Sequence, residues 1–219
     1  MATQPARTRR TRERDLVAAT RSLFDARGGL DVPIEEIAQA VGIARGLTYR
    51  QFSSKEELYF LTVTDYLDEL ATELREAAGD AADPVEKLAR GVEVYARFCA
   101  RYPAFLDSAL MLMKHPTSEL QEIVSESVWL RLGQAIVRRV ERVAEVLRAG
   151  AEDGTFDVAD PDYTANIIWT QVLGTMHLAR MRVGIRQAAP GIPALFDVEP
   201  DHVVQTCVAS ALASAGAGR

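Results

Sequence analysis

Apolar residues recur every three or four positions along most of the chain, which is the spacing of a helix with one buried face. In residues 84–101, for example, Leu88, Val92, Tyr95 and Cys99 follow one another at this spacing. The same pattern predicts nine helices, over residues 11–27, 34–41, 44–52, 54–78, 84–101, 104–114, 118–150, 161–183 and 200–213. Residues 184–200 are predicted to be a loop because they are rich in proline and glycine. The pattern therefore predicts an all-α protein with no strand.

Two short helices separated by a glycine stand out near the N-terminus. In the first, Ile34, Ile37 and Val41 share one helical face. Gly42 follows, where a glycine can adopt the left-handed conformation that ends a helix. Two helices joined by such a short turn are typical of the helix-turn-helix motif, whose second helix enters the major groove of DNA.

The second of these helices is crowded with side chains suited to nucleic acid. Arginine and glutamine can make paired hydrogen bonds with base edges, and threonine and tyrosine hydroxyls suit phosphate oxygens. Lys55 begins the next helix, where the helix dipole disfavours a cation unless an anion lies nearby. The Arg-rich segment 1–10 is predicted to be disordered, either as a solubilising tail or as an arm that contacts DNA. The predicted DNA-binding residues are Arg45, Gly46, Thr48, Tyr49, Arg50, Gln51, Lys55, Arg9 and Arg10.

Residues 11–58 resemble the DNA-binding domain of the tetracycline-repressor (TetR) family of bacterial regulators. The matching segments are LVAATRSLFDARGG, IEEIAQAVGIARGLTYRQF and SSKEEL, in the order and near the spacing of that family. The resemblance implies an all-helical homodimer with two domains. Residues 1–57 would be an N-terminal arm and helix-turn-helix domain, and residues 58–219 a domain that binds a small effector and dimerises.

Three positions depart from the family pattern. Family members usually carry serine or threonine where Ala44 stands, and commonly a hydroxyl residue where Pro33 stands. Both positions cap helices and can touch phosphates, so the departures imply weaker contacts there. Thr48 stands where an aliphatic residue is more usual.

Taken over the whole chain, the net charge of −6 argues against binding to nucleic acid. The conclusion changes when the charge is counted separately for two parts of the chain. Residues 1–57 hold ten Lys or Arg and eight Asp or Glu, a balance of +2, so the remainder carries −8. Positive charge near the predicted reading helix attracts phosphate, and the acidic remainder repels it. No apolar run approaches the ~18 residues of a membrane span, and the N-terminus does not look like a signal peptide. We therefore expect a cytoplasmic protein without a membrane partner.

The residues that carry catalytic or metal chemistry are scattered. Cys99 and Cys207 lie in apolar helical patterns and are expected to be buried thiols rather than a disulfide. The three histidines have no metal-ligand spacing. Neither paired carboxylates, nor a Ser/His/Asp arrangement, nor a phosphate-binding glycine loop is apparent. We expect a protein that is not an enzyme and needs no cofactor or metal.

The helix predicted over residues 161–183 is apolar on more than one face, and such a helix must be covered on both sides. Gly174 costs ~1 kcal/mol in a helix interior relative to alanine, which favours close approach by another backbone. We predict that this helix and the last one form a four-helix bundle with a second copy of the chain. The alternative is that one subunit buries the whole helix. The predicted dimerisation residues are Ile168, Trp169, Val172, Met176, Val204 and Val208.

Large, adaptable side chains gather in residues 95–132, as in binding sites that are mostly apolar with a few polar groups. The predicted ligand-binding residues are Tyr95, Phe98, Tyr102, Phe105, Met111, Met113, Trp129 and His177. Further polar candidates are Arg101, Asp107 and His115. The alternative is that this stripe is ordinary helix core. The composition favours an elongated apolar or aromatic effector.

Together these features predict a ligand-responsive transcriptional regulator, most simply a repressor. It would bind double-stranded, palindromic operator DNA as a homodimer and be released by its effector. The alternative is an architectural, chromosome-organising DNA-binding protein with no effector. That protein would have a well-packed C-terminal core and many genomic sites.

Overall fold

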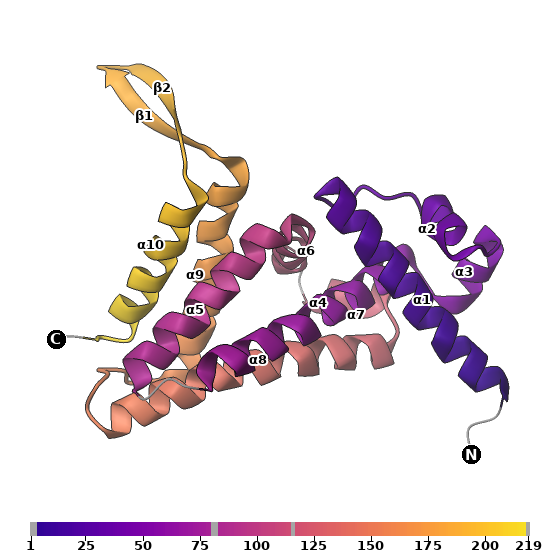
Figure 1. Ribbon diagram of the computed structural model, residues 1–219, viewed down its shortest axis with the longest axis horizontal. Helices are drawn as coiled ribbons and strands as arrows, with labels where there is room; N and C mark the ends of the chain where they lie inside the picture. Colours follow the sequence, from indigo (N-terminus) through magenta and orange to yellow (C-terminus); the bar gives the residue numbers. More distant parts are fainter. Residues whose placement is uncertain (1–3, 80–82, 115–116, 218–219) are drawn as a thin grey trace. The chain divides into compact units, whose positions relative to one another are not determined.

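The computed structural model describes residues 4–79, 83–114 and 117–217, which form a mostly helical fold with one β-hairpin (Figure 1). The helices are α1 Gln4–Arg27, α2 Ile34–Val41, α3 Arg45–Gln51, α4 Lys55–Ala78, α5 Pro84–Arg101, α6 Pro103–Lys114, α7 Thr117–Ile123, α8 Glu126–Glu152, α9 Pro161–Met181 and α10 Pro200–Ser214. The strands are β1 Val183–Ala189 and β2 Ile192–Asp197. No helix in these ranges is long and apolar enough to cross a membrane.

The chain divides into two compact units. Unit 1 combines Met1–Asp68 with Pro103–Ile136, and unit 2 combines Glu69–Tyr102 with Val137–Arg219. Helices α4 and α8 each contribute to both units. The boundary predicted after residue 57 concerns domains of function and stays a prediction.

In unit 1, α1 packs across α2 and α3, as the apolar stripe of residues 11–27 predicts (Figure 1). Phe24 is fully buried, and its ring meets that of Tyr59 edge to face, with 4.8 Å between the ring centroids. The Tyr59 hydroxyl donates to the carbonyl oxygens of Leu30 and Val32, both at 3.1 Å. The start of α4 is therefore fixed to the loop that precedes α2.

In unit 2, α5, α9 and α10 lie side by side (Figure 1). The rings of Tyr95 and Trp169 stack with their centroids 4.4 Å apart, which joins α5 to α9. Cys99 on α5 and Cys207 on α10 are buried free thiols, as predicted. Burial raises the pKa of Cys207 to about 11 and raises that of Cys99 further, so neither is an activated thiol.

The structure corrects two predicted boundaries. Residues 4–10, predicted to be disordered, continue helix α1. Arginine, alanine and glutamine are good helix formers, and extending an existing helix avoids the cost of nucleation. The helix predicted over 118–150 is interrupted at Val124 and Ser125, and the Ser125 carbonyl accepts hydrogen bonds from the backbone of Val128 and Trp129 at the start of α8.

The third correction is the β-hairpin, which replaces the predicted loop. Gly191, with φ of 78°, supplies the left-handed conformation at the tight turn between the strands. Arg182 is also left-handed, with φ of 57°, and ends α9 immediately before β1. Proline and glycine were interpreted as loop signals, whereas here they form a hairpin turn and an edge strand.

Candidate nucleic-acid interface

The turn between α2 and α3 has the predicted geometry. Gly42 has φ of 71° and its N–H donates to the carbonyls of Ala38 and Gln39, so the glycine ends α2 as predicted. Ile34, Ile37 and Ala38 are buried and hold α2 in unit 1. Helix α3 begins three residues after Gly42, which is the short connection of a helix-turn-helix.

Helix α3 has one exposed face and one buried face. Arg45, Gly46, Tyr49 and Arg50 are exposed. Arg45 and Tyr49 are four residues apart, as are Gly46 and Arg50, so these two neighbouring rows form the exposed side of the helix. Thr48 and Gln51, also predicted to bind DNA, are only 1% and 8% exposed and face the interior. Their burial places them away from the exposed face of α3, and their contact with DNA stays a prediction.

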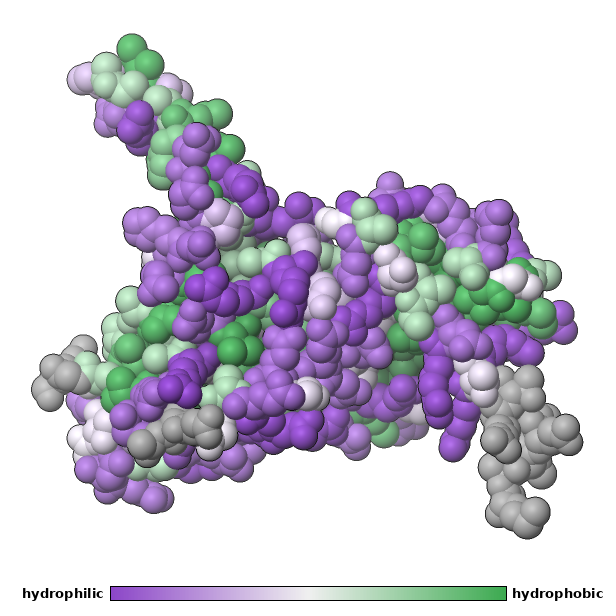
Figure 2. All heavy atoms as spheres, viewed as in Figure 1, coloured by the Kyte–Doolittle hydropathy of each residue, from purple (hydrophilic) through white to green (hydrophobic). Residues whose placement is uncertain are grey.

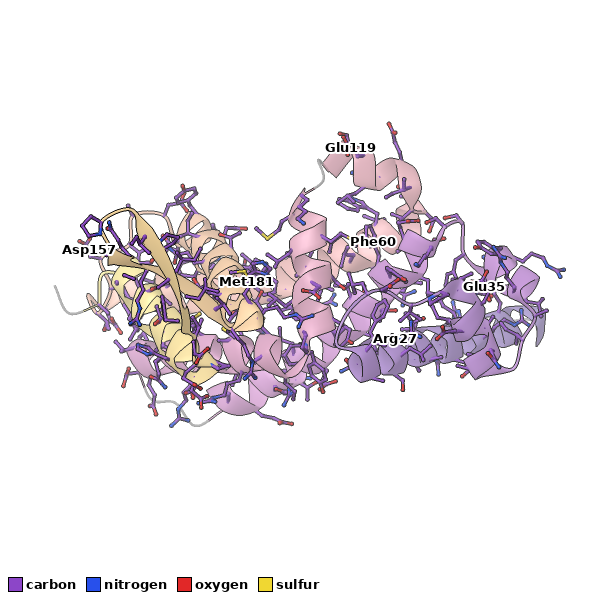
Figure 3. The ribbon with its side chains drawn as sticks, turned by 90° about the horizontal axis from the view of Figure 1, so that it is seen from above. Arg27, Glu35, Phe60, Glu119, Asp157 and Met181 are labelled. Carbon is purple, nitrogen blue, oxygen red and sulfur yellow. The ribbon has the colours of Figure 1, made fainter. Side chains whose placement is uncertain are left out.

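Arg45 is held in place by two neighbours. Its Nη1 lies 2.8 Å from the Oε1 of Glu35 on α2, and its Nη2 donates to the Tyr49 hydroxyl at 3.5 Å. The hydrogen bond with Tyr49 and the charge of Glu35 raise the pKa of Arg45 above its usual value. Figure 3 labels Glu35 at the surface of this part of the chain. The guanidinium is therefore charged and oriented at the exposed face of α3.

A second ion pair joins α1 to α2. Arg27, at the end of α1, pairs with Glu36 and donates to the Asp31 carbonyl at 2.6 Å (Figure 3 labels Arg27). The hydrogen bond with Glu36 raises the pKa of Arg27. Both groups are exposed, so the pair fixes the angle between helices more than it stabilises the fold.

Three other predicted DNA contacts lie outside α3. Lys55 is half-buried, with its Nζ 5.0 Å from the centroid of the Tyr59 ring, so an aromatic face gives it a partner within the protein. Arg9 and Arg10 are exposed and project from the first turns of α1 rather than from a disordered arm. Their contact with DNA stays a prediction.

Sequence reasoning missed a buried carboxylate at the base of the motif. Glu57, on α4, accepts hydrogen bonds from the backbone N–H and the hydroxyl of Ser53 at 2.5 and 2.6 Å, and one from the hydroxyl of Ser125. Ser54 accepts from the Glu57 N–H at 3.0 Å and donates to the Ile123 carbonyl at 2.8 Å. Ser54 thus caps the start of α4, and together with Glu57 it ties α4 to the junction of α7 and α8.

The pKa of Glu57 shows which effect dominates at this carboxylate. Burial alone would raise the pKa, but the hydrogen bonds from Ser125 and Ser53 outweigh it and the pKa is lowered. Glu57 is therefore ionised while buried. No signal in the sequence indicated this partner, because an unbroken helix was predicted over residues 118–150.

The predicted ligand-binding residues are divided between the two units. In unit 1, Phe105 is buried, Met111 and Trp129 are half-buried, and Met113 is exposed. In unit 2, Tyr95 and Phe98 are buried, Tyr102 is half-buried and His177 is exposed. His115 lies outside the described residues. The exposed side chains of Met113 and His177 are not core, and the ligand-binding role of the set stays a prediction.

The predicted dimerisation residues are mostly covered by their own chain. Ile168, Val172, Met176 and Val204 are buried, whereas Trp169 and Val208 are half-buried. These four buried side chains pack between α9 and its neighbours α5 and α10 within one subunit. Trp169 and Val208 keep some exposed surface, and the role of the six residues in a dimer stays a prediction.

An α2 with one buried face, a left-handed glycine and an α3 with an exposed cationic face define a helix-turn-helix DNA-binding protein. Residues 16–61 match the family described as "Bacterial regulatory proteins, tetR family". The repressor KstR2 of Mycobacterium tuberculosis is 25% identical over 183 residues, which cover 84% of each chain. The regulator HbdR of Aromatoleum sp. is 29% identical over 107 residues, or 49% of this chain and 45% of HbdR.

A solved structure gives the same fold over nearly the whole chain. RolR, crystallised with resorcinol, is similar with a TM-score of 0.72 over 97% of this chain and 91% of RolR, at 19% identity. This likeness concerns the fold alone. The match of residues 16–61 and the similarity to KstR2 identify the helix-turn-helix domain as that of the TetR family. The protein is thus a DNA-binding transcriptional regulator, and not an enzyme.

Proposed function

We propose that this regulator is a repressor that binds a palindromic operator as a homodimer and is released by a small, largely apolar or aromatic effector. The observation that carries the DNA-binding part is the exposed face of α3, where Arg45, Tyr49 and Arg50 stand together. Repression as the sign of regulation is supported by KstR2, a repressor similar to this chain over most of its length.

On this face, Arg45 and Arg50 would read base edges and Tyr49 would contact phosphate. Gly46 lies between them, and a Cβ added there would meet no protein atom within 4 Å. Packing within the protein therefore does not require a glycine at this position. We propose that the missing side chain lets the DNA backbone approach α3 closely.

The dimer would form through the exposed face of α9. Tyr163, Leu178 and Met181 are 66%, 37% and 53% exposed, and Gly174 lies exposed between them along the helix. A Cβ at Gly174 would also meet nothing within 4 Å in this chain. A neighbouring helix could approach there, and a twofold axis would set the two α3 helices about 34 Å apart, or a multiple of that distance.

Effector release needs a route from the effector to the DNA-reading motif. Within unit 1, the ring of Phe105, a predicted ligand-binding residue, lies 5.9 Å from that of Tyr66, and the Tyr66 hydroxyl donates to Asp25 on α1 at 2.5 Å. The hydrogen bonds of Glu57 provide a second link, from the start of α4 to the start of α8. An effector that fits one conformer of these links better than the other would shift the population and change operator affinity.

Fluorescence anisotropy with the intergenic DNA upstream of the gene tests the proposal. Arg50→Ala should weaken binding at least about tenfold by removing a base or phosphate contact. Arg142→Ala is the matched control, because Arg142 is an exposed arginine on α8 in unit 2; we expect a change within about twofold. Equal affinity for unrelated DNA would favour the architectural alternative, and no effect of Arg50→Ala would contradict the assignment of α3.

A further inference from the structure

The β-hairpin is almost entirely uncovered in one copy of the chain. Along both strands only Gly184 is buried and Ala194 half-buried, and every other residue is exposed. Figure 2 shows apolar side chains gathered along this hairpin. Ile185 and Leu195 are 75% and 68% exposed, which is far more than α9 or α10 leaves for any aliphatic side chain.

The register separates the two faces of the hairpin. Phe196 pairs with Gly184, and its ring lies so close that a Cβ at Gly184 would be 2.2 Å from it. Arg186 pairs with Ala194 on that same face. On the other face Ile185 stands directly opposite Leu195, and Val183 stands opposite Asp197 at the base of the hairpin. We call Val183, Ile185 and Leu195 the apolar hairpin face.

A two-stranded hairpin without a third layer is at best marginally stable in water. We therefore expect another surface to pack against the apolar hairpin face and bury it. Addition of another strand is disfavoured along β2, because Pro193 has no N–H to donate at that edge. Strand addition at the open edge of β1 would still leave the side chains of Ile185 and Leu195 exposed. The covering surface should therefore pack on the face, against these two side chains.

We propose that the apolar hairpin face docks on a second copy of this chain, as an arm that reaches across the homodimer. This rests on the proposed dimer through α9. Exposed apolar residues continue from that helix onto the arm on both sides of Arg182, with Leu178 and Met181 before it and Val183 and Ile185 after it. Figure 3 labels Met181 where α9 meets the hairpin.

The hairpin arm is long enough to reach a second copy of the chain. The arm begins at the ends of α9 and α10, the helices of the proposed interface (Figure 1). The 7 residues of β1 span about 20 Å at ~3.3 Å per residue. A helix with its side chains is about 10 Å across. An arm rooted at the interface is thus long enough to extend over a helix of the partner.

Sedimentation equilibrium of the full-length protein tests the arm. The double variant Ile185→Asp, Leu195→Asp should raise the dimer dissociation constant about 100-fold, because two buried apolar side chains become charged. Arg186→Glu is the control on the opposite face and should change it by less than about threefold. Circular dichroism of each variant checks that the helices remain folded. If the double variant dimerises like the wild type, the proposed docking of the arm is wrong, whereas the proposed dimer through α9 is unaffected.

A photo-crosslinking residue at Ile185 identifies the occupant directly. We expect a crosslink to a second copy, recognised in a mixture of isotopically labelled and unlabelled chains. A crosslink confined to the same chain would overturn the proposal. Binding to anionic lipid vesicles would also overturn the proposal if the double Asp variant abolished it without changing the dimer. A membrane, and not a second copy, would then cover the apolar hairpin face. A wild-type protein that stays monomeric at micromolar concentration would exclude both the dimer and the arm.

Discussion

Thr48 carries an unsatisfied hydroxyl inside unit 1. Its side chain is 1% exposed, and its Oγ1 has no hydrogen-bond partner among the residues that the structure describes. Valine has nearly the same shape, with a methyl group in place of the hydroxyl, and the same branching at Cβ, so Thr48→Val should leave the helix intact. The variant removes only the buried polar group.

The size of the effect follows from the desolvation of that hydroxyl. Burying a hydroxyl without a partner costs ~1–3 kcal/mol in proteins. We therefore expect Thr48→Val to raise the free energy of unfolding by about 1 kcal/mol or more. For a chain of this size the melting temperature should rise about 2–4 °C for each kcal/mol. Because Thr48 does not reach the surface, operator affinity should stay within about twofold of the wild type.

Urea and thermal unfolding measure the stability, and anisotropy with operator DNA measures the affinity. Thr62 is the matched control, since it is also a buried helical threonine in unit 1, but its Oγ1 donates to the Leu58 carbonyl at 2.9 Å. Thr62→Val should bring no gain and could lose up to about 1 kcal/mol. A Thr48→Val variant that binds operator tenfold more weakly, with no gain in stability, would refute the interior placement of Thr48.

Three further substitutions test the interface. Ala44 precedes α3 without a side-chain cap; Ala44→Ser should add ~1 kcal/mol to the free energy of unfolding, measured in urea. Glu35→Ala removes the partner 2.8 Å from Arg45; anisotropy should show about threefold tighter binding to unrelated DNA but poorer discrimination of operator. Ser125→Ala removes a hydrogen bond that lowers the pKa of Glu57 against the effect of burial. The lowered pKa stabilises the fold above the unfolded value of ~4.3, and this stabilisation is lost as pH falls through the folded pKa. Ser125→Ala should therefore make acid unfolding, followed by circular dichroism, begin at a higher pH, and should cost about 1–2 kcal/mol at pH 7.

The sequence predicted the features that local patterns determine. Apolar residues at helical spacing predicted the helices of both units, and Gly42 predicted the turn of the motif, because a left-handed residue at that place needs no distant partner. Arg45 and Arg50 of α3, predicted to bind DNA, are exposed, and their contact with DNA stays a prediction. The buried face of α3 was not distinguished from its exposed face, because a seven-residue helix with one apolar residue, Leu47, gives little periodic signal.

The features that the sequence did not predict depend on distant partners. Ser125 ends one helix and begins another because its side chain meets Glu57, which is 68 residues earlier in the chain. The burial of Ile168 and Val172 within one chain was not predicted, because packing by α5 and α10 cannot be inferred from one helix alone. The hairpin was missed because its strands lack the usual alternation of polar and apolar faces, so Pro193 and Gly191 dominated the pattern.

Selection of bound sequences from a random pool of double-stranded DNA tests the central claim most directly. The full-length protein should enrich an inverted repeat whose half-sites are one helical turn apart, about 10 base pairs, or a multiple of that spacing. Arg50→Ala should lose this enrichment while the fold is retained. Recovery of the same repeat by Arg50→Ala, or failure of the wild type to enrich any sequence, would contradict the assignment of α3 as the element that reads DNA.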